Sequence, residues 1–180
     1  MPNSFSASIT GLGSITATSV LVRYTGATGV TAGTVLTVGG TSYTFTQAIA
    51  ANTLAFELTG FSANVADFVS LSGNLGFKKS GADIIAVGTS INASLSAGGS
   101  VSVSLTNASF GLQASASSTA FELKEGSFSA SITGLGSISA TSVLVRYTGA
   151  TGVTSGTVLT VGSTSYTFTN DIAAHTIAFE

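Results

Sequence analysis

Apolar and polar residues alternate along much of this chain. In residues 4–10, Phe5, Ala7 and Ile9 occupy alternate positions, and serines fill most of the positions between them. Because successive side chains on a β-strand point to opposite faces, this period of two predicts a strand with one face buried. Alternation of the same kind returns from Ile91 onward. Strands are therefore the elements expected along most of the sequence.

One pair of strands is predicted to form a tight hairpin. Gly39-Gly40 stands between two β-prone segments, Thr34–Val38 and Thr41–Thr46. A two-residue glycine turn flanked by such segments is a strong hairpin signal, because glycine takes the positive φ angles that these turns require. Gly162-Ser163 stands at the corresponding place later in the chain and predicts a second hairpin.

Three further local features follow from the same pattern. A strand rich in Val, Thr and Tyr is expected over about Thr16–Tyr24, and Gln47–Asn52 is the one segment that suggests a helical turn. A polar turn at Glu125-Gly126 is expected to separate the strand around Phe121 from the strand around Phe128.

The predicted fold class is all-β. Strands joined by short Gly/Ser turns favour antiparallel neighbours, because parallel pairs need long crossover connections. We therefore expect an antiparallel meander packed as an elongated two-sheet rod or sandwich. Two alternatives stay open at this point: tandem immunoglobulin-like sandwiches, and a parallel β-helix, for which the sequence shows no convincing coil register.

The chain repeats itself. Residues 127–180 match residues 4–57 without a gap, with 47 of 54 positions identical and an offset of 123 residues. This period predicts a short leader at residues 1–3, one complete repeat at 4–126 and the truncated start of a second repeat at 127–180. A weaker internal match relates Ala55–Leu58 to Ala120–Leu123, both reading Ala-Phe-Glu-Leu.

Composition narrows the possible partners. Only 7% of residues are charged and the formal net charge is −2, so the chain has no basic surface for nucleic acid. There is no cysteine, which excludes disulfides and thiolate metal sites, and no apolar run is long enough for a membrane-spanning helix. Short polar residues such as Ser and Thr, rather than charges, fill the non-apolar positions.

No catalytic or cofactor-binding motif is apparent, so we expect a protein that is not an enzyme and has no catalytic, cofactor or metal site. The single histidine, His175, aligns with Asn52 in the first copy, which argues against a catalytic base. Arg23 and its repeat equivalent Arg146 are expected to pair with a nearby glutamate or to extend to water. The carboxylates are scattered and suggest neither a paired catalytic site nor a calcium loop: Glu57, Asp67, Asp83, Glu122, Glu125, Asp171 and Glu180.

Three segments of the unit resemble repeats of very large bacterial β-strand-repeat proteins. They are Phe68–Lys79, Ala86–Gly88 and Ser104–Leu112. Proteins of this kind are similar to giant surface or secreted adhesins, so the resemblance implies an extracellular or cell-surface, filamentous or adhesive role. Many of them carry Asp-rich calcium repeats, and this chain has none.

The function expected from these observations is structural. The chain is expected to be a repeat segment of an extracellular bacterial fibre or giant adhesin stalk, with copies of itself as partners through strand edges and repeat stacking. The strand edge expected at Thr176–Glu180 is one such contact. The alternative is a carbohydrate- or surface-binding β module that meets cell-surface glycans through its tyrosines, Tyr24, Tyr43, Tyr147 and Tyr166.

Overall fold

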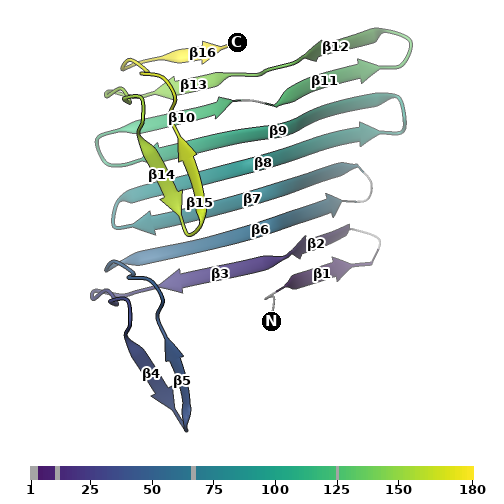
Figure 1. Cartoon of the computed structure of the whole chain (residues 1–180). Helices are drawn as coiled ribbons and strands as arrows, with labels where there is room; N and C mark the ends of the chain where they lie inside the picture. The colour runs from purple at the N-terminus through teal and green to yellow at the C-terminus, as the bar shows by residue number, and fades with distance from the viewer. Residues whose placement is uncertain (1–3, 11–12, 66–67, 125) are drawn as a thin grey trace.

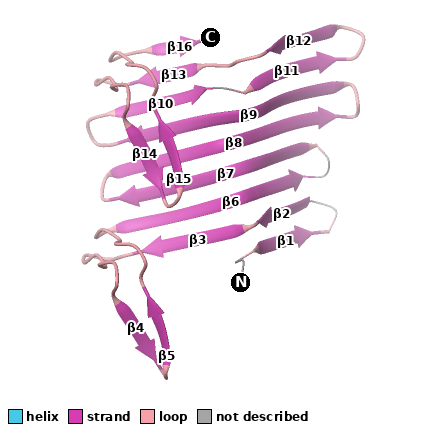
Figure 2. Ribbon diagram, viewed as in Figure 1, coloured by secondary structure: helices cyan, strands magenta, loops and turns pink. Residues whose placement is uncertain are grey.

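The structure is a computed structural model that describes residues 4–10, 13–65, 68–124 and 126–180; the predicted leader, residues 1–3, lies outside them. Across the described residues the chain forms strands joined by turns and contains no helix (Figure 2). The predicted all-β class is therefore confirmed. The segment 47–52 is not a helical turn, because Ile49 instead forms an antiparallel bridge with Val30.

The strands fall into two groups that follow the repeat. The first group is β1 (Phe5–Ile9), β2 (Gly13–Ala17), β3 (Ser19–Tyr24), β4 (Val35–Val38), β5 (Thr41–Thr44), β6 (Thr53–Val65), β7 (Val69–Ser80), β8 (Asp83–Ala97), β9 (Val101–Ala114) and β10 (Thr119–Lys124). The second copy contributes β11 (Ser127–Ile132), β12 (Gly136–Ala140), β13 (Val145–Thr148), β14 (Val158–Val161), β15 (Thr164–Thr167) and β16 (Ile177–Phe179).

Twelve of these strands form one antiparallel sheet that runs through both copies (Figure 1). Its main path is β1-β2-β6-β7-β8-β9-β10-β13-β16, with β3 beside β6, β11 beside β9 and β12 beside β11. The antiparallel meander is confirmed, and every ladder between described strands is antiparallel, unlike a parallel β-helix. Because the sheet is continuous, the two copies are not separate sandwich beads.

Pairs of consecutive short strands share the length of one long neighbour. Strands β10 and β11 both run antiparallel to β9, so the chain does not reverse at Gly126 and the predicted turn there is wrong. In the same way β2 and β3 both lie along β6, with Thr18 between them, so the strand expected at Thr16–Tyr24 is divided. In both places the hydrogen bonds of a long neighbouring strand hold the two short segments in line.

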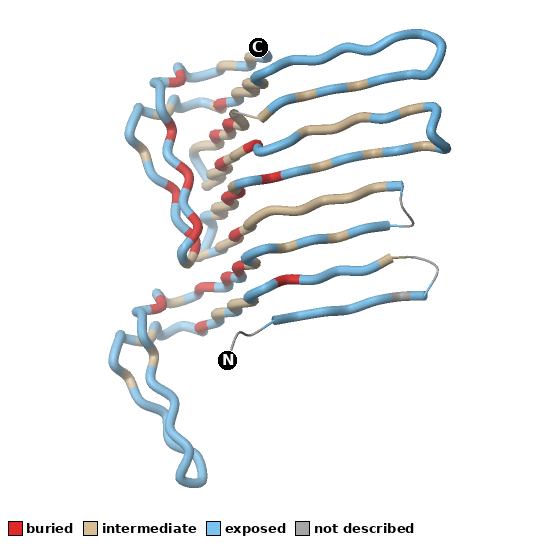
Figure 3. Tube along the Cα trace, turned by 45° about the vertical axis from the view of Figure 1, so that its right-hand side comes forward, coloured by how far each residue is buried: buried red, intermediate tan, exposed pale blue. Residues whose placement is uncertain are grey.

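A line of irregular positions crosses the sheet and divides each long strand in two. The ladders shift register near Gly60, Gly73 and Ser90, and these residues have positive φ values of 57°, 142° and 53°. Asn107 of β9 continues the line at 56°. Such bulges bend a strand locally, and Figure 3 shows the long strands changing direction there.

The second layer of the fold is a hairpin from the second copy. Strands β14 and β15 form a separate two-stranded sheet that lies across one face of β6 to β9 (Figure 1). The buried core lies between this hairpin and the sheet, and it combines residues of both copies: Ala55, Val87, Ala120, Leu159, Val161, Tyr166, Phe168 and Ile172. The predicted two-layer packing is thus made by one large sheet and one hairpin, on one side of the bend only.

Candidate self-association interface

A row of five residues across the sheet receives the hairpin. Glu57, Gly76, Val87, Gly111 and Glu122 are consecutive cross-strand partners on β6, β7, β8, β9 and β10. We call these five residues the docking row. Two glycines flank one buried valine, and a glutamate stands at each end.

The two glycines of the docking row make room for the hairpin. A Cβ atom added at Gly76 would lie 2.7 Å from the Cβ of Val161, and one added at Gly111 would overlap the ring of Tyr166. Neither separation is sterically possible, so these positions admit the hairpin side chains only as glycine. The closeness of the two layers follows directly from this absence of side chains.

At one end of the docking row, Glu57 binds the hairpin turn. Its Oε1 atom accepts hydrogen bonds from the Ser163 amide at 2.8 Å, the Ser163 hydroxyl at 2.6 Å and the Thr164 hydroxyl at 2.9 Å. Burial raises the pKa of the Glu57 carboxyl, but these hydrogen bonds outweigh it and hold the pKa below its usual range. Gly162 packs so closely on the carboxylate that it has no space for a Cβ atom.

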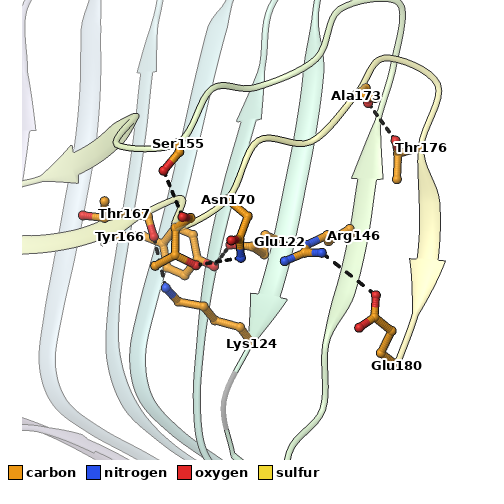
Figure 4. A network of polar contacts seen from close by, with 11 residues as sticks. Glu122, Lys124, Arg146, Ser155, Tyr166, Thr167, Asn170, Ala173, Thr176 and Glu180 are labelled. Carbon is orange, nitrogen blue, oxygen red and sulfur yellow. Dashed lines mark hydrogen bonds and ion pairs between the residues drawn. The ribbon is translucent and has the colours of Figure 1, made fainter.

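At the other end, Glu122 binds the base of the hairpin (Figure 4). Its side chain is fully buried; Oε1 accepts a hydrogen bond from the Tyr166 hydroxyl at 2.6 Å, and Oε2 accepts one from Arg146 Nε at 2.9 Å. The Nζ of Lys124 lies 5.0 Å from the centre of the Tyr166 ring and donates to the Thr167 carbonyl. A buried carboxylate is stable only with such partners, so Glu122 depends on Arg146 and Tyr166 for its charge to be tolerated.

The equivalent hairpin of the first copy, β4–β5, is not covered by any sheet among the residues that the structure describes. It projects from the large sheet, whereas β14–β15 lies on it (Figures 1 and 3). Tyr43 is 61% exposed and its equivalent Tyr166 only 3%; Val38 is 81% exposed and its equivalent Val161 only 2%. The two hairpins have nearly the same sequence, so a neighbouring sheet, not the hairpin itself, accounts for the burial.

A groove lies between the projecting hairpin and the outer edge of β3. It has a volume of about 280 Å³, and its lining includes Arg23, Tyr43 and Gln47. Among the described strands, β3 pairs with β6 alone, whereas its equivalent β13 pairs with both β10 and β16. Beside β13, therefore, strand β10 of the preceding unit, with Glu122, fills the place that is a groove beside β3.

The arginines and tyrosines highlighted by the sequence have different surroundings in the two copies. Arg146 pairs with Glu122 as predicted, but Arg23 donates from Nη2 to Gln47 Oε1 at 2.6 Å instead. Tyr24, Tyr43 and Tyr147 are exposed, whereas the buried Tyr166 offers no surface to a glycan.

The remaining candidates do not assemble into a site. Asn52 and His175 both have a left-handed backbone, with φ of 53° and 57°, and asparagine and histidine tolerate this conformation better than most residues. Asp67 and Glu125 lie outside the described residues, and among the described residues no three potential metal ligands cluster. The described residues also include no apolar helix of bilayer-spanning length.

Sequence reasoning missed the docking row. The one signal that pointed to it is the internal Ala-Phe-Glu-Leu match, because its two glutamates are Glu57 and Glu122. Gly76 and Gly111 carried no distinguishing signal. Comparison with known proteins does not help to interpret the interface, since no protein-family model, no curated protein and no solved structure matches this chain.

Proposed function

We propose that this chain is a structural repeat segment of a fibre or stalk, in which each unit covers its neighbour with a hairpin and continues its sheet. The observation that supports this most directly is the contrast between β14–β15, which is buried on the sheet of the preceding unit, and β4–β5, which projects from the sheet and is exposed. A unit that buries its apolar hairpin only on a neighbour gains stability from stacking.

The geometry supports an elongated assembly. From β6 to its equivalent β16 the path takes six strand-to-strand steps, through β7, β8, β9, β10 and β13. Strands in a sheet are about 4.8 Å apart, so one repeat advances the sheet by about 29 Å. Added units would lengthen a rod by this increment without changing its width.

The ends of the sheet support self-association. The N-terminal end exposes Val22, Tyr24 and the apolar side chains of the projecting hairpin, and the outer edges of β3 and β16 pair with no other described strand. Unpaired edges and exposed apolar patches promote association between copies. An extracellular or cell-surface location remains part of the proposal, resting on the composition and the resemblance described above.

A chain lengthened by one unit tests the proposal. Inserting a second copy of residues 4–126 ahead of residue 127 is expected to lengthen the particle by about 29 Å in small-angle X-ray scattering. It is also expected to bury the hairpin of the inserted unit, leaving only the first one exposed. A particle that becomes a string of independent globules, or a second hairpin that stays exposed, would refute it. Light scattering of the present chain at rising concentration should show self-association, and a strict monomer counts against that part.

A further inference from the structure

The second copy shows how a repeat unit holds an extended strand. Strand β10 lies antiparallel to β13, with Ala120 opposite Thr148, Phe121 opposite Tyr147 and Glu122 opposite Arg146. The Gly149 amide donates to the Thr119 carbonyl at 2.8 Å and extends this pairing. Side chains from two separate elements then bind the glutamate: Arg146 from β13 and Tyr166 from β15. Backbone pairing supplies general affinity in such strand additions, and side-chain contacts supply specificity.

The first copy carries the same binding residues around an open groove. Arg23 and Tyr43 are the repeat equivalents of Arg146 and Tyr166, and both line the groove beside β3. We propose that this groove is a binding site for an extended Ala-Phe-Glu strand of a second repeat unit, with Arg23 and Tyr43 binding its glutamate. This deepens the proposed function and rests on it for the source of the strand.

Gln47 occupies the position of the missing carboxylate. The Oε1 atom of Gln47 accepts a hydrogen bond from Arg23. Its shorter equivalent in the second copy, Asn170, instead donates to Thr169, and Arg146 donates to Glu122. A neutral amide is a weaker partner for a guanidinium than a carboxylate. The entering glutamate therefore displaces Gln47, and the Arg23 side chain exchanges one partner for a stronger one.

Tyr24 provides a second contact on the opposite face of the strand. Its equivalent Tyr147 stands directly opposite Phe121 of β10 and is 42% exposed, whereas Tyr24 is 76% exposed. A strand added beside β3 in the same register places its phenylalanine next to Tyr24. The site thus contacts two adjacent side chains of the bound strand, Phe and Glu, which lie on its two opposite faces.

A synthetic peptide of residues 117–126 tests this site in the full chain. The peptide is titrated into isotope-labelled protein into the millimolar range, where a single added strand binds detectably by NMR. Shifts are expected in residues 22–25 and 43–47. The equivalent residues 145–148 should not move, because β10 already fills their site. No saturable shift in residues 22–25, or equal shifts in both copies, overturns the proposal.

Matched variants separate recognition of the glutamate from nonspecific strand pairing. A peptide with Glu122→Gln and a protein with Tyr43→Phe are each expected to bind at least about tenfold more weakly, since each loses a hydrogen bond to a charged group. Gln47→Ala should bind at least as well as the unchanged chain, because it removes a competitor for Arg23. Tyr43 and Gln47 are both exposed, so the two protein variants fold. Unchanged affinity for the Glu122→Gln peptide overturns the proposal.

The two proposals fail in different ways. If the lengthened chain grows by one increment but Glu122→Gln in the peptide changes nothing, the strand-binding site is wrong and the structural function stands. If the peptide binds with the expected selectivity but the lengthened chain forms separate globules, the site is right and the structural function is wrong.

Discussion

The hydroxyl of Tyr166 offers the sharpest test of how the hairpin is held. Tyr166→Phe keeps the ring that packs over Gly111 and deletes only the oxygen bound to Glu122. Tyr43→Phe is the matched control, because it makes the same change in the identical segment Thr-Ser-Tyr-Thr-Phe-Thr of the exposed hairpin. The local sequence is constant, so a difference between the two variants measures docking.

The size of the effect follows from the geometry of the bond. The Tyr166 hydroxyl lies 2.6 Å from a carboxylate oxygen of Glu122, which is fully buried. A hydrogen bond to a charged group contributes about 1.5–3 kcal/mol, and its loss leaves the buried oxygen without its donor. Tyr166→Phe should therefore weaken hairpin docking by about 10- to 150-fold, at about 1.4 kcal/mol per tenfold. Tyr43→Phe should stay within about 0.5 kcal/mol of the unchanged protein.

Amide hydrogen exchange can measure this difference directly. The amides of Phe168 and Ile172 donate to Thr157 and Val153, and the equivalent amides of the projecting hairpin make the same bonds within it. An isolated two-stranded hairpin is only marginally stable, so the docked amides should exchange more slowly. Tyr166→Phe should reduce this protection and Tyr43→Phe should not affect it. Equal protection of both hairpins, or equal loss in both variants, would refute the role given to docking.

Three further changes probe the docking row. Because the pKa of Glu57 is lowered in the folded protein, its contribution to docking should be fully present above the ordinary glutamate value of about 4.3 and lost as pH falls below it. Protection of the hairpin amides, relative to their intrinsic exchange rate at each pH, should fall accordingly. Glu57→Gln should abolish this pH dependence of the protection. Gly111→Ala should destabilise the protein by about 1–3 kcal/mol in urea unfolding, whereas Gly26→Ala, which has open space around it, should not. Ser163→Gly, which copies Gly40 of the first hairpin, should cost about 1.5 kcal/mol of docking, at the low end because two other donors to Glu57 remain.

Local pattern was enough to predict several elements of this fold. Alternating serines and apolar residues predicted β1 and β11, and the glycine pair at residues 39–40 predicted the hairpin β4–β5. These predictions succeed because strand and turn preferences depend on residues close together in the chain. The prediction of a turn at Gly126 failed, because pairing with the distant strand β9 keeps the chain running in one direction there.

Only the tertiary structure distinguished the two copies. Tyr43 and Tyr166 have the same neighbours in sequence, yet one is exposed and the other is bound to a buried glutamate 44 residues away. Likewise, the sequence around Gly76 and Gly111 does not distinguish them, because their role depends on side chains that approach from a distant hairpin. The sequence by itself determined the all-β class, several of the strands and the repeat. The packing of one copy on the other decided which surfaces are buried, because burial depends on the neighbour that a segment meets in space.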